Sequence, residues 1–323
     1  QYATLTSTYT VTENSFYDDS NTSDYCTGDK NTSFKVTNAG VKAIADKFAE
    51  MYYPIQVMSG SSSLKGFNSL SYIIANPEKI TILITDLGAE IKPTSNGGES
   101  VLATLGYFAP MDLYCNVNTL GQIETSPGKP QISTITKQPL YSNQRQMFTV
   151  NTVSYSKYFG AEDLFSTLAH EYNHMINYIY KVLGYGTKYD TWFTEMLSLT
   201  TEDYVSGILN IYNTVQDRLS YFMKGTSQGM INWDGNEDVL YSYAYAYAFG
   251  AFLLRNYGGP NDGTDLLLEM ATNDKYGKDA ISAALEELGY TNAKGNAKTY
   301  DDVLLEFAFT LRNADGNDDR LPT

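Results

Sequence analysis

Apolar positions in the first half of the chain predict several strands and one helix. Over residues 38–53 they recur every three or four positions, as on one face of a helix, and we expect Pro54 to end that helix. The compact β-branched run KITILITD at residues 79–86 predicts a buried strand. Further strands are expected at residues 7–11, 101–108, 132–135 and 146–153.

Beyond about residue 158 the spacing of apolar residues becomes helical. We expect a first long helix to end at Gly184, and a second, over residues 191–206, to end at Gly207. Further helices are expected at residues 241–256, 264–272, 278–288 and 300–311. At residues 241–247 Tyr and Ala alternate, and this period of two fits a half-buried strand equally well locally. We favour a helix there because no turn signal follows until residues 258–260.

These patterns predict an α+β fold in which a strand-rich N-terminal half packs on a helical C-terminal half. We place the strand-rich subdomain at residues 1–157 and the helical subdomain at residues 158–312. Residues 313–323 are typical of a tail or linker, after which the native protein can continue. Because the chain begins at Gln1 without a leader segment, we expect a processed or trimmed form.

Composition and charge exclude several classes of protein. A hydrophobic content of 42% excludes disorder as the overall description. The net charge of −15 repels phosphate backbones and anionic lipid, so we expect no nucleic-acid partner. No apolar run reaches the roughly 20 residues that span a bilayer, so no membrane insertion is expected. The abundance of Tyr, Ser, Thr and Asn favours a secreted, extracellular protein, and we favour a monomer.

The two cysteines, Cys26 and Cys115, are far apart and show no C-x-x-C pattern. They form either one disulfide or two separate thiols, and they do not make a cysteine-built metal site.

The sequence HEYNH at residues 170–174 carries the candidate chemistry, and it contains both histidines of the chain. On a helix, residues four apart lie one turn above each other, so His170 and His174 project to the same side and can bind one metal ion. Imidazole nitrogen suits zinc, which in catalytic sites keeps one position for water. Glu171 can reach that water and take its proton as a general base.

A third protein ligand is expected downstream, on the next predicted helix. Glu195 fits, because two helices joined by a short loop can bring its carboxylate to the histidine pair; alternatively it only complements the helix dipole. Glu202 lies seven residues further on the same helix face, and Asp203 adjoins it. One of these two carboxylates can accept the second N–H of a ligand histidine, although a surface pair is equally plausible.

The strings LAHEYNHMIN and TWFTEMLS resemble the gluzincin metallopeptidases, and within them the hyicolysin family of secreted bacterial neutral metalloproteases. Supporting strings are ILITDLG at residues 82–88, GYFAPMD at 106–112 and SNQRQMFTVNT at 142–152, and the resemblance covers roughly residues 40–312. It implies a zincin-like fold with the active-site cleft between the two halves. It also implies zinc ligation by His170, His174 and Glu195, with Glu171 as the general base. A GxMEN exopeptidase signature is lacking, which favours an endopeptidase acting on protein or peptide substrates.

A hydrogen-bond donor for the developing oxyanion is expected near the zinc, and without a third histidine it must be a tyrosine or an arginine. Tyr243 is our candidate, from a stretch that resembles the gluzincin helix facing the zinc. Structural calcium at residues 261–263 or 315–319 is a weaker expectation, because neither segment fits the full calcium-loop pattern. The alternative function is a non-catalytic, adhesin-like module that binds through its tyrosine-rich surface.

Overall fold

The computed structural model shows a mixed α+β protein. It describes residues 38–61, 80–93, 99–155, 161–188, 190–211, 213–224, 230–231, 233, 239–259 and 263–313. The chain divides into two compact units. The first contains Gln1–Asp46 and Ser62–Met175, and the second contains Lys47–Ser61 and Ile176–Thr323.

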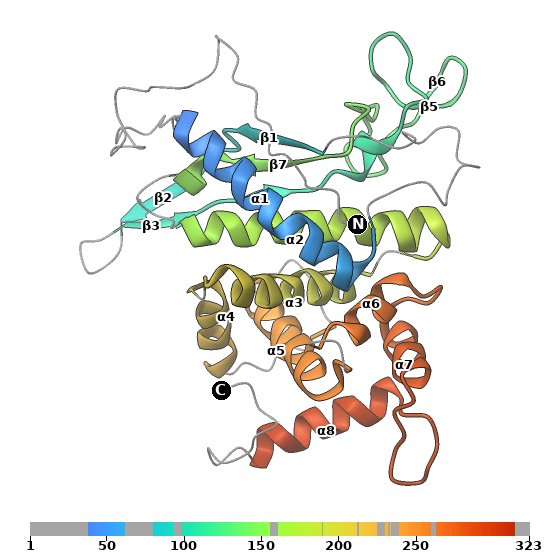
Figure 1. Cartoon of the computed structure of the whole chain (residues 1–323). Coiled ribbons are helices and arrows are strands. Elements are labelled where there is room, and N and C mark those ends of the chain that lie inside the picture. The colour runs from blue at the N-terminus through green and yellow to red at the C-terminus, as the bar shows by residue number, and fades with distance from the viewer. Residues whose placement is uncertain are drawn as a thin grey trace. The chain divides into compact units, whose positions relative to one another are not determined.

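The first unit contains a three-stranded sheet. Its strands are β1 (Thr81–Thr85), β7 (Met147–Asn151) and β4 (Gly106–Tyr107), in the order β1-β7-β4, and Figure 1 labels β1 and β7. β1 runs parallel to β7 and β4 runs antiparallel to it. Every residue of β7 is buried, as expected for the middle strand of a covered sheet. The three strings upstream of the histidine motif therefore come together in one sheet.

The side chain of Asn151, at the end of β7, joins the loops beside this sheet. Its Nδ2 donates to the carbonyl oxygens of Gly88 (3.0 Å) and Thr104 (2.8 Å), and its Oδ1 accepts from the backbone N–H of Leu87 (3.3 Å). Its own backbone N–H donates to the Leu105 carbonyl at 2.7 Å. Because Asn151 is completely buried, these bonds fix the segment after β1 and the segment before β4 with little competition from water.

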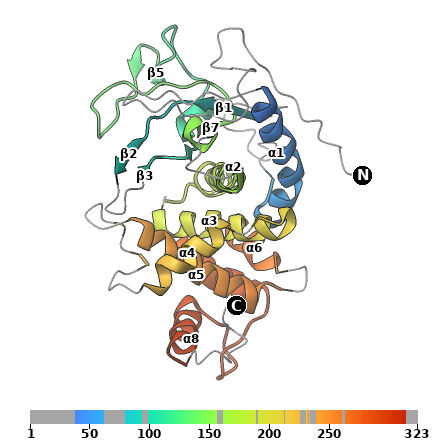
Figure 2. The same ribbon diagram turned by 90° about the vertical axis from the view of Figure 1, so that its left-hand side faces the viewer.

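Helix α2 (Ala161–Asn177) follows β7, and Figure 2 shows it along its axis with β7 beside it. The first unit also contains two small antiparallel sheets, one of β2 (Glu90–Pro93) with β3 (Glu99–Leu102) and one of β5 (Glu124–Ser126) with β6 (Lys129–Pro130).

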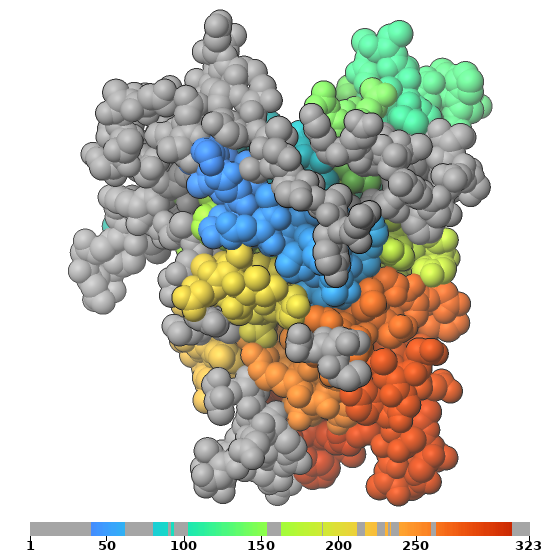
Figure 3. Space-filling view, viewed as in Figure 1, coloured from blue at the N-terminus to red at the C-terminus, as the bar shows by residue number. Residues whose placement is uncertain are grey.

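The second unit is helical. Beyond α2 the chain continues as a π-helical segment, Tyr178–Gly184. The helices that follow are α3 (Thr191–Leu209), α4 (Asn213–Met223), α5 (Val239–Tyr257), α6 (Asp265–Thr272), α7 (Gly277–Glu287) and α8 (Tyr300–Asn313). The apolar helix α5 contacts α3, α4, α6 and α8, and its buried residues are the centre of the core. Figure 3 shows α6, α7 and α8 (orange to red) as one continuous surface.

Two predicted helix ends are wrong. Helix α1 (Asn38–Ser59) continues through Pro54, because the turns beyond it bury Ile55 and Met58 completely. Helix α3 likewise continues past Gly207 and ends at Leu209, where Asn210 adopts the left-handed conformation (φ 55°) that terminates helices.

Of the other predicted elements, some are confirmed and some are wrong. The strands expected at residues 79–86 and 146–153 are confirmed as β1 and β7, and the segment 241–256 is helical, as α5. The strand expected at 101–108 is interrupted after β3 and resumes as β4, and the one expected at 132–135 is a turn whose Ile132 makes an isolated bridge to Pro139. Helix α4 was not predicted. The strand expected at 7–11 and the tail beyond residue 313 lie outside the described residues.

None of the helices in the described part of the chain combines the length and the apolar character that a membrane span requires.

Candidate metal centre

The two histidines face each other from successive turns of α2. Their Nε2 atoms are 2.9 Å apart, and their ring centroids are separated by 4.5 Å with the ring planes at 78°. His170 and His174 are each less than 10% exposed. The helical spacing of four residues therefore produces the predicted convergence of two imidazole nitrogens on one point.

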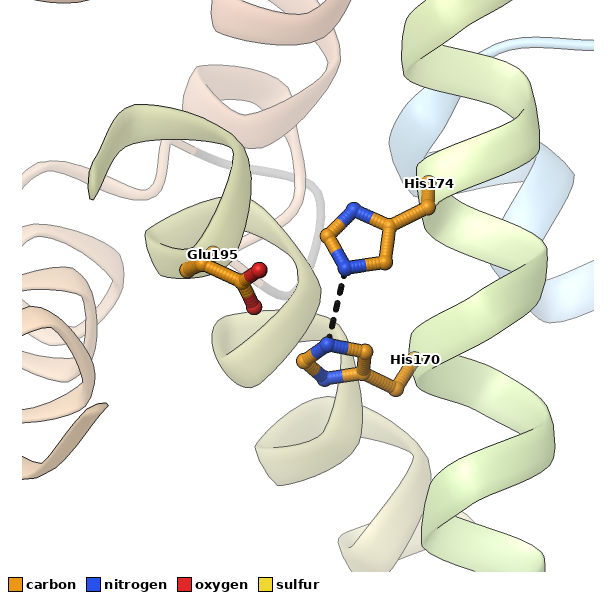
Figure 4. A group of neighbouring side chains, drawn as sticks. All are labelled: His170, His174 and Glu195. Atoms are coloured by element: carbon orange, nitrogen blue, oxygen red, sulfur yellow. Dashed lines mark hydrogen bonds between the residues drawn. The ribbon is translucent and has the colours of Figure 1, made fainter. Parts of the chain in front are cut away.

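Glu195, in the first turns of α3, joins this pair (Figure 4). One ligand atom from each of His170, His174 and Glu195 lies within 4.8 Å of the other two. In the described ranges of the chain this is the one group of three or more His, Cys, Asp or Glu residues found close enough to hold a metal ion. The structure thus brings together the three residues that the sequence nominates as ligands.

The chemistry of this group fits zinc. Two imidazole nitrogens and one carboxylate oxygen form the donor set of many catalytic zinc sites, which leave a further position for water. Glu195 is buried, and a buried carboxylate is costly unless a positive charge or hydrogen bonds compensate for the lost solvation. A divalent cation shared with two imidazoles supplies such compensation.

Glu171 is buried beside the first histidine, and strand β4 passes directly over it. A Cβ added at Gly106 would lie 3.4 Å from Glu171 Cγ and 2.7 Å from Thr167 Cγ2. The backbone of β4 therefore forms a wall against this face of α2. The sequence gives no signal for this contact, because residues 106 and 171 are far apart in the chain.

Polar contacts hold the first turn of α3, directly before Glu195. The indole N–H of Trp192 donates to Asp190 Oδ2 at 2.8 Å, and the Tyr276 hydroxyl donates to the Asp190 carbonyl at 3.1 Å and also contacts Thr194 Oγ1. Burial raises the pKa of Tyr276 to about 12, so this phenol stays protonated and keeps its donor. Burial also raises the pKa of Asp190. The sequence did not indicate a role for Asp190 or Tyr276.

The predicted oxyanion donor Tyr243 is half-buried on α5. Its ring packs edge-on against Trp233, with the ring centroids 4.9 Å apart. The guanidinium of Arg218 lies 5.3 Å from the centroid of the Tyr243 ring. Arg218 also bonds Glu202 at 3.3 Å, so it connects two residues that the sequence nominated. Arg218 itself was not predicted, because it belongs to the unpredicted helix α4.

Asp203, the other carboxylate expected near the histidines, has partners on α5. It accepts from Arg255 Nη1 at 2.8 Å and from the Tyr247 hydroxyl at 3.3 Å. The roles of Tyr243, Glu202 and Asp203 in the site stay predictions.

Cys115 is half-buried, and Cys26 lies outside the described residues. Nothing supports a calcium site, and the segments considered for it lie mostly outside the described part of the chain.

Comparison with known proteins agrees with this chemistry. The chain is similar to the neutral metalloprotease ShpI of Staphylococcus hyicus, with 25% identity over 185 residues. The matched segment covers 54% of this chain and 34% of ShpI, so the chain corresponds to about a third of the length of that relative. The family model of Peptidase M30 matches residues 5–310, nearly the whole chain, and the chain therefore belongs to the Peptidase M30 family.

Proposed function

We propose that the protein is a secreted, zinc-dependent endopeptidase. The convergence of His170, His174 and Glu195 within 4.8 Å carries the proposal, because their donor set is one that holds zinc in hydrolases. Membership of the Peptidase M30 family and similarity to a neutral metalloprotease support the reaction class. The abundance of Tyr, Ser, Thr and Asn supports secretion.

In this proposal the three ligands hold the zinc, and Glu171 performs the proton transfers. When bound, zinc polarises the scissile carbonyl and makes water more acidic. Glu171 accepts a proton from the attacking water and delivers it to the departing amine nitrogen. Tyr243 is the candidate hydrogen-bond donor to the carbonyl oxygen as negative charge develops there.

The substrates are polypeptides, and the net charge of −15 favours neutral or cationic ones, because an acidic protein repels anionic substrates and slows their approach. Glu202 and Asp203 stay candidates for orienting a ligand histidine. For Glu202, the bond to Arg218 offers a means of fixing the carboxylate.

Substitution of Glu171 by Gln tests the assignment. The variant keeps the size of the side chain but removes the base, so we expect hydrolysis of casein to fall by about 10²–10⁴-fold while zinc remains bound, as measured by elemental analysis. Glu286→Gln, at an exposed position on α7, is the control and should keep full activity. Retained proteolysis in Glu171→Gln would refute its role as the base.

Chelation of the wild-type protein tests the function as a whole. We expect a chelator to stop casein digestion and added zinc to restore it. Absence of digestion by protein that contains no zinc after incubation with the metal would favour the non-catalytic binding module.

A further inference from the structure

The close approach between strand β4 and helix α2 occurs at a single glycine. Gly106 pairs with Val150 of β7, and the space at its Cα is closed by two elements. A Cβ there would lie 2.7 Å from Thr167 Cγ2 on α2 and 2.8 Å from the Thr149 carbonyl oxygen on β7. Both distances are shorter than carbon atoms tolerate, so only glycine fits without movement.

Space, and not backbone conformation, requires this glycine. Gly106 is absent from the residues with positive φ, so any L-residue could adopt its backbone angles. Glycine also weakens a strand interior, because it has no side chain to pack and loses more entropy on folding. Its presence in β4 therefore indicates that another backbone or side chain must come very close.

The surroundings of Gly106 resist movement. The Thr149 oxygen belongs to the buried middle strand, and the Thr167 hydroxyl donates to the Asp163 carbonyl at 2.7 Å, which holds the Thr167 methyl group toward the strand. The chain just before Gly106 is fixed in turn by Asn151, which bonds the carbonyls of Thr104 and Leu105. Because Thr149 and Thr167 are held in place, a methyl group added at Gly106 would push on the third neighbour within 4 Å.

That neighbour is Glu171, whose Cγ lies 3.4 Å from the place of the added Cβ. Thr167 and Glu171 are one helical turn apart, so both stand on the face of α2 that β4 covers. We propose that Gly106 is a positioning residue, which lets β4 pack flush on α2 and so holds the side chain of Glu171 in its productive orientation. This inference rests on the proposed function, in which Glu171 is the base.

The test is Gly106→Ala in the full chain, with Gly207→Ala as the matched control. Gly207 is a glycine on α3 whose added Cβ would meet nothing within 4 Å. For Gly106→Ala we expect kcat on a peptide substrate to fall by about 10–100-fold, with KM within about twofold of the wild type and full zinc content, because small misplacements of a catalytic group are costly. Gly207→Ala should keep the kinetics of the wild type.

A second substitution tests the contact itself. Thr167→Ser removes the methyl group that an alanine at position 106 would meet and keeps the hydroxyl for the Asp163 carbonyl. In the Gly106→Ala, Thr167→Ser double variant we expect kcat to recover at least threefold over Gly106→Ala, because removing this clash lets Glu171 return toward its position. If Gly106→Ala does not fold, the double variant is compared with Thr167→Ser alone and should show the lower kcat.

The outcomes separate this inference from the proposed function. An inactive wild type refutes the proposed function. If the wild type is active and Gly106→Ala keeps the wild-type kcat, the role of Gly106 is overturned and the proposed function stands. The same holds if the double variant keeps the kcat of Thr167→Ser.

Discussion

Lys181 is completely buried in the π-helical segment that follows the histidine-bearing helix. Its ammonium group donates to the backbone carbonyls of Asn273 and Lys275 and to Asn273 Oδ1, at 2.7–2.8 Å. Three acceptors match the three donors of an ammonium group, and they connect this segment to the turn between α6 and α7. Burial nevertheless lowers the pKa of Lys181 to about 7, with a smaller opposing effect from Asp274.

The lowered pKa makes stability depend on pH. Between about pH 7 and the ordinary lysine pKa of 10.5, the unfolded chain binds a proton that the folded protein lacks, so the free energy of unfolding should rise with pH. The slope should approach, at most, about 1.4 kcal/mol per pH unit. Urea unfolding at pH 7 and pH 9 measures it. Lys181→Met should lose the slope, whereas Lys294→Met, at an exposed position, should keep it; equal slopes in both variants would contradict the argument.

Helices α3 and α5 approach each other closely at Gly250. A Cβ added there would overlap Thr200 Oγ1 and lie 3.0 Å from Met196 Cγ. Thr200 cannot turn away freely, because its hydroxyl donates to the Met196 carbonyl at 2.6 Å. The glycine in the middle of α5 is therefore a packing requirement of the helix pair.

Two Gly→Ala substitutions in helices should consequently have opposite effects. Gly250→Ala should lower the free energy of unfolding by about 1–3 kcal/mol, because overpacking outweighs the better helix propensity of alanine. Gly207→Ala should raise it by about 0.5–1 kcal/mol, since its Cβ meets open space. Chemical denaturation of both variants checks the pair, and a stabilised Gly250→Ala would show that the two helices separate easily.

The sequence predicted the existence of most elements but fewer of their ends. Helical periodicity depends on residues close in the chain, so α2, α3 and α5 were predicted. At residues 241–247, where a strand was the alternative, the predicted helix is confirmed as part of α5. Ends depend in part on tertiary burial, and Pro54 does not stop its helix because the turns beyond it are buried. Helix α3 continues two residues past Gly207 and ends only before the left-handed Asn210. The break between β3 and β4 was missed because β4 is defined by its pairing with β7, a partner distant in the sequence.

In the molecule as a whole, the sequence predicted those parts of the candidate site that depend on residues close together in the chain. The spacing of His170 and His174 is a property of one helix, and Glu195 follows on the next one. The contacts around them are long-range: Gly106 against Glu171, and Tyr276 against the start of α3. A single sequence carries no signal for such pairs, so the structure was needed to find them.

Binding of zinc should stabilise the whole molecule, because a ligand that binds only the folded state shifts the unfolding equilibrium by mass action. A hundredfold excess over the dissociation constant contributes about 2.7 kcal/mol. We therefore expect a chelator to lower the melting temperature by several degrees and zinc to restore it. His174→Ala should not respond to zinc because it lacks a ligand, whereas Glu171→Gln should respond like the wild type because it lacks only the base. Calorimetry of these two variants thus separates metal binding from catalysis, and a full response in His174→Ala would place the stabilising metal elsewhere.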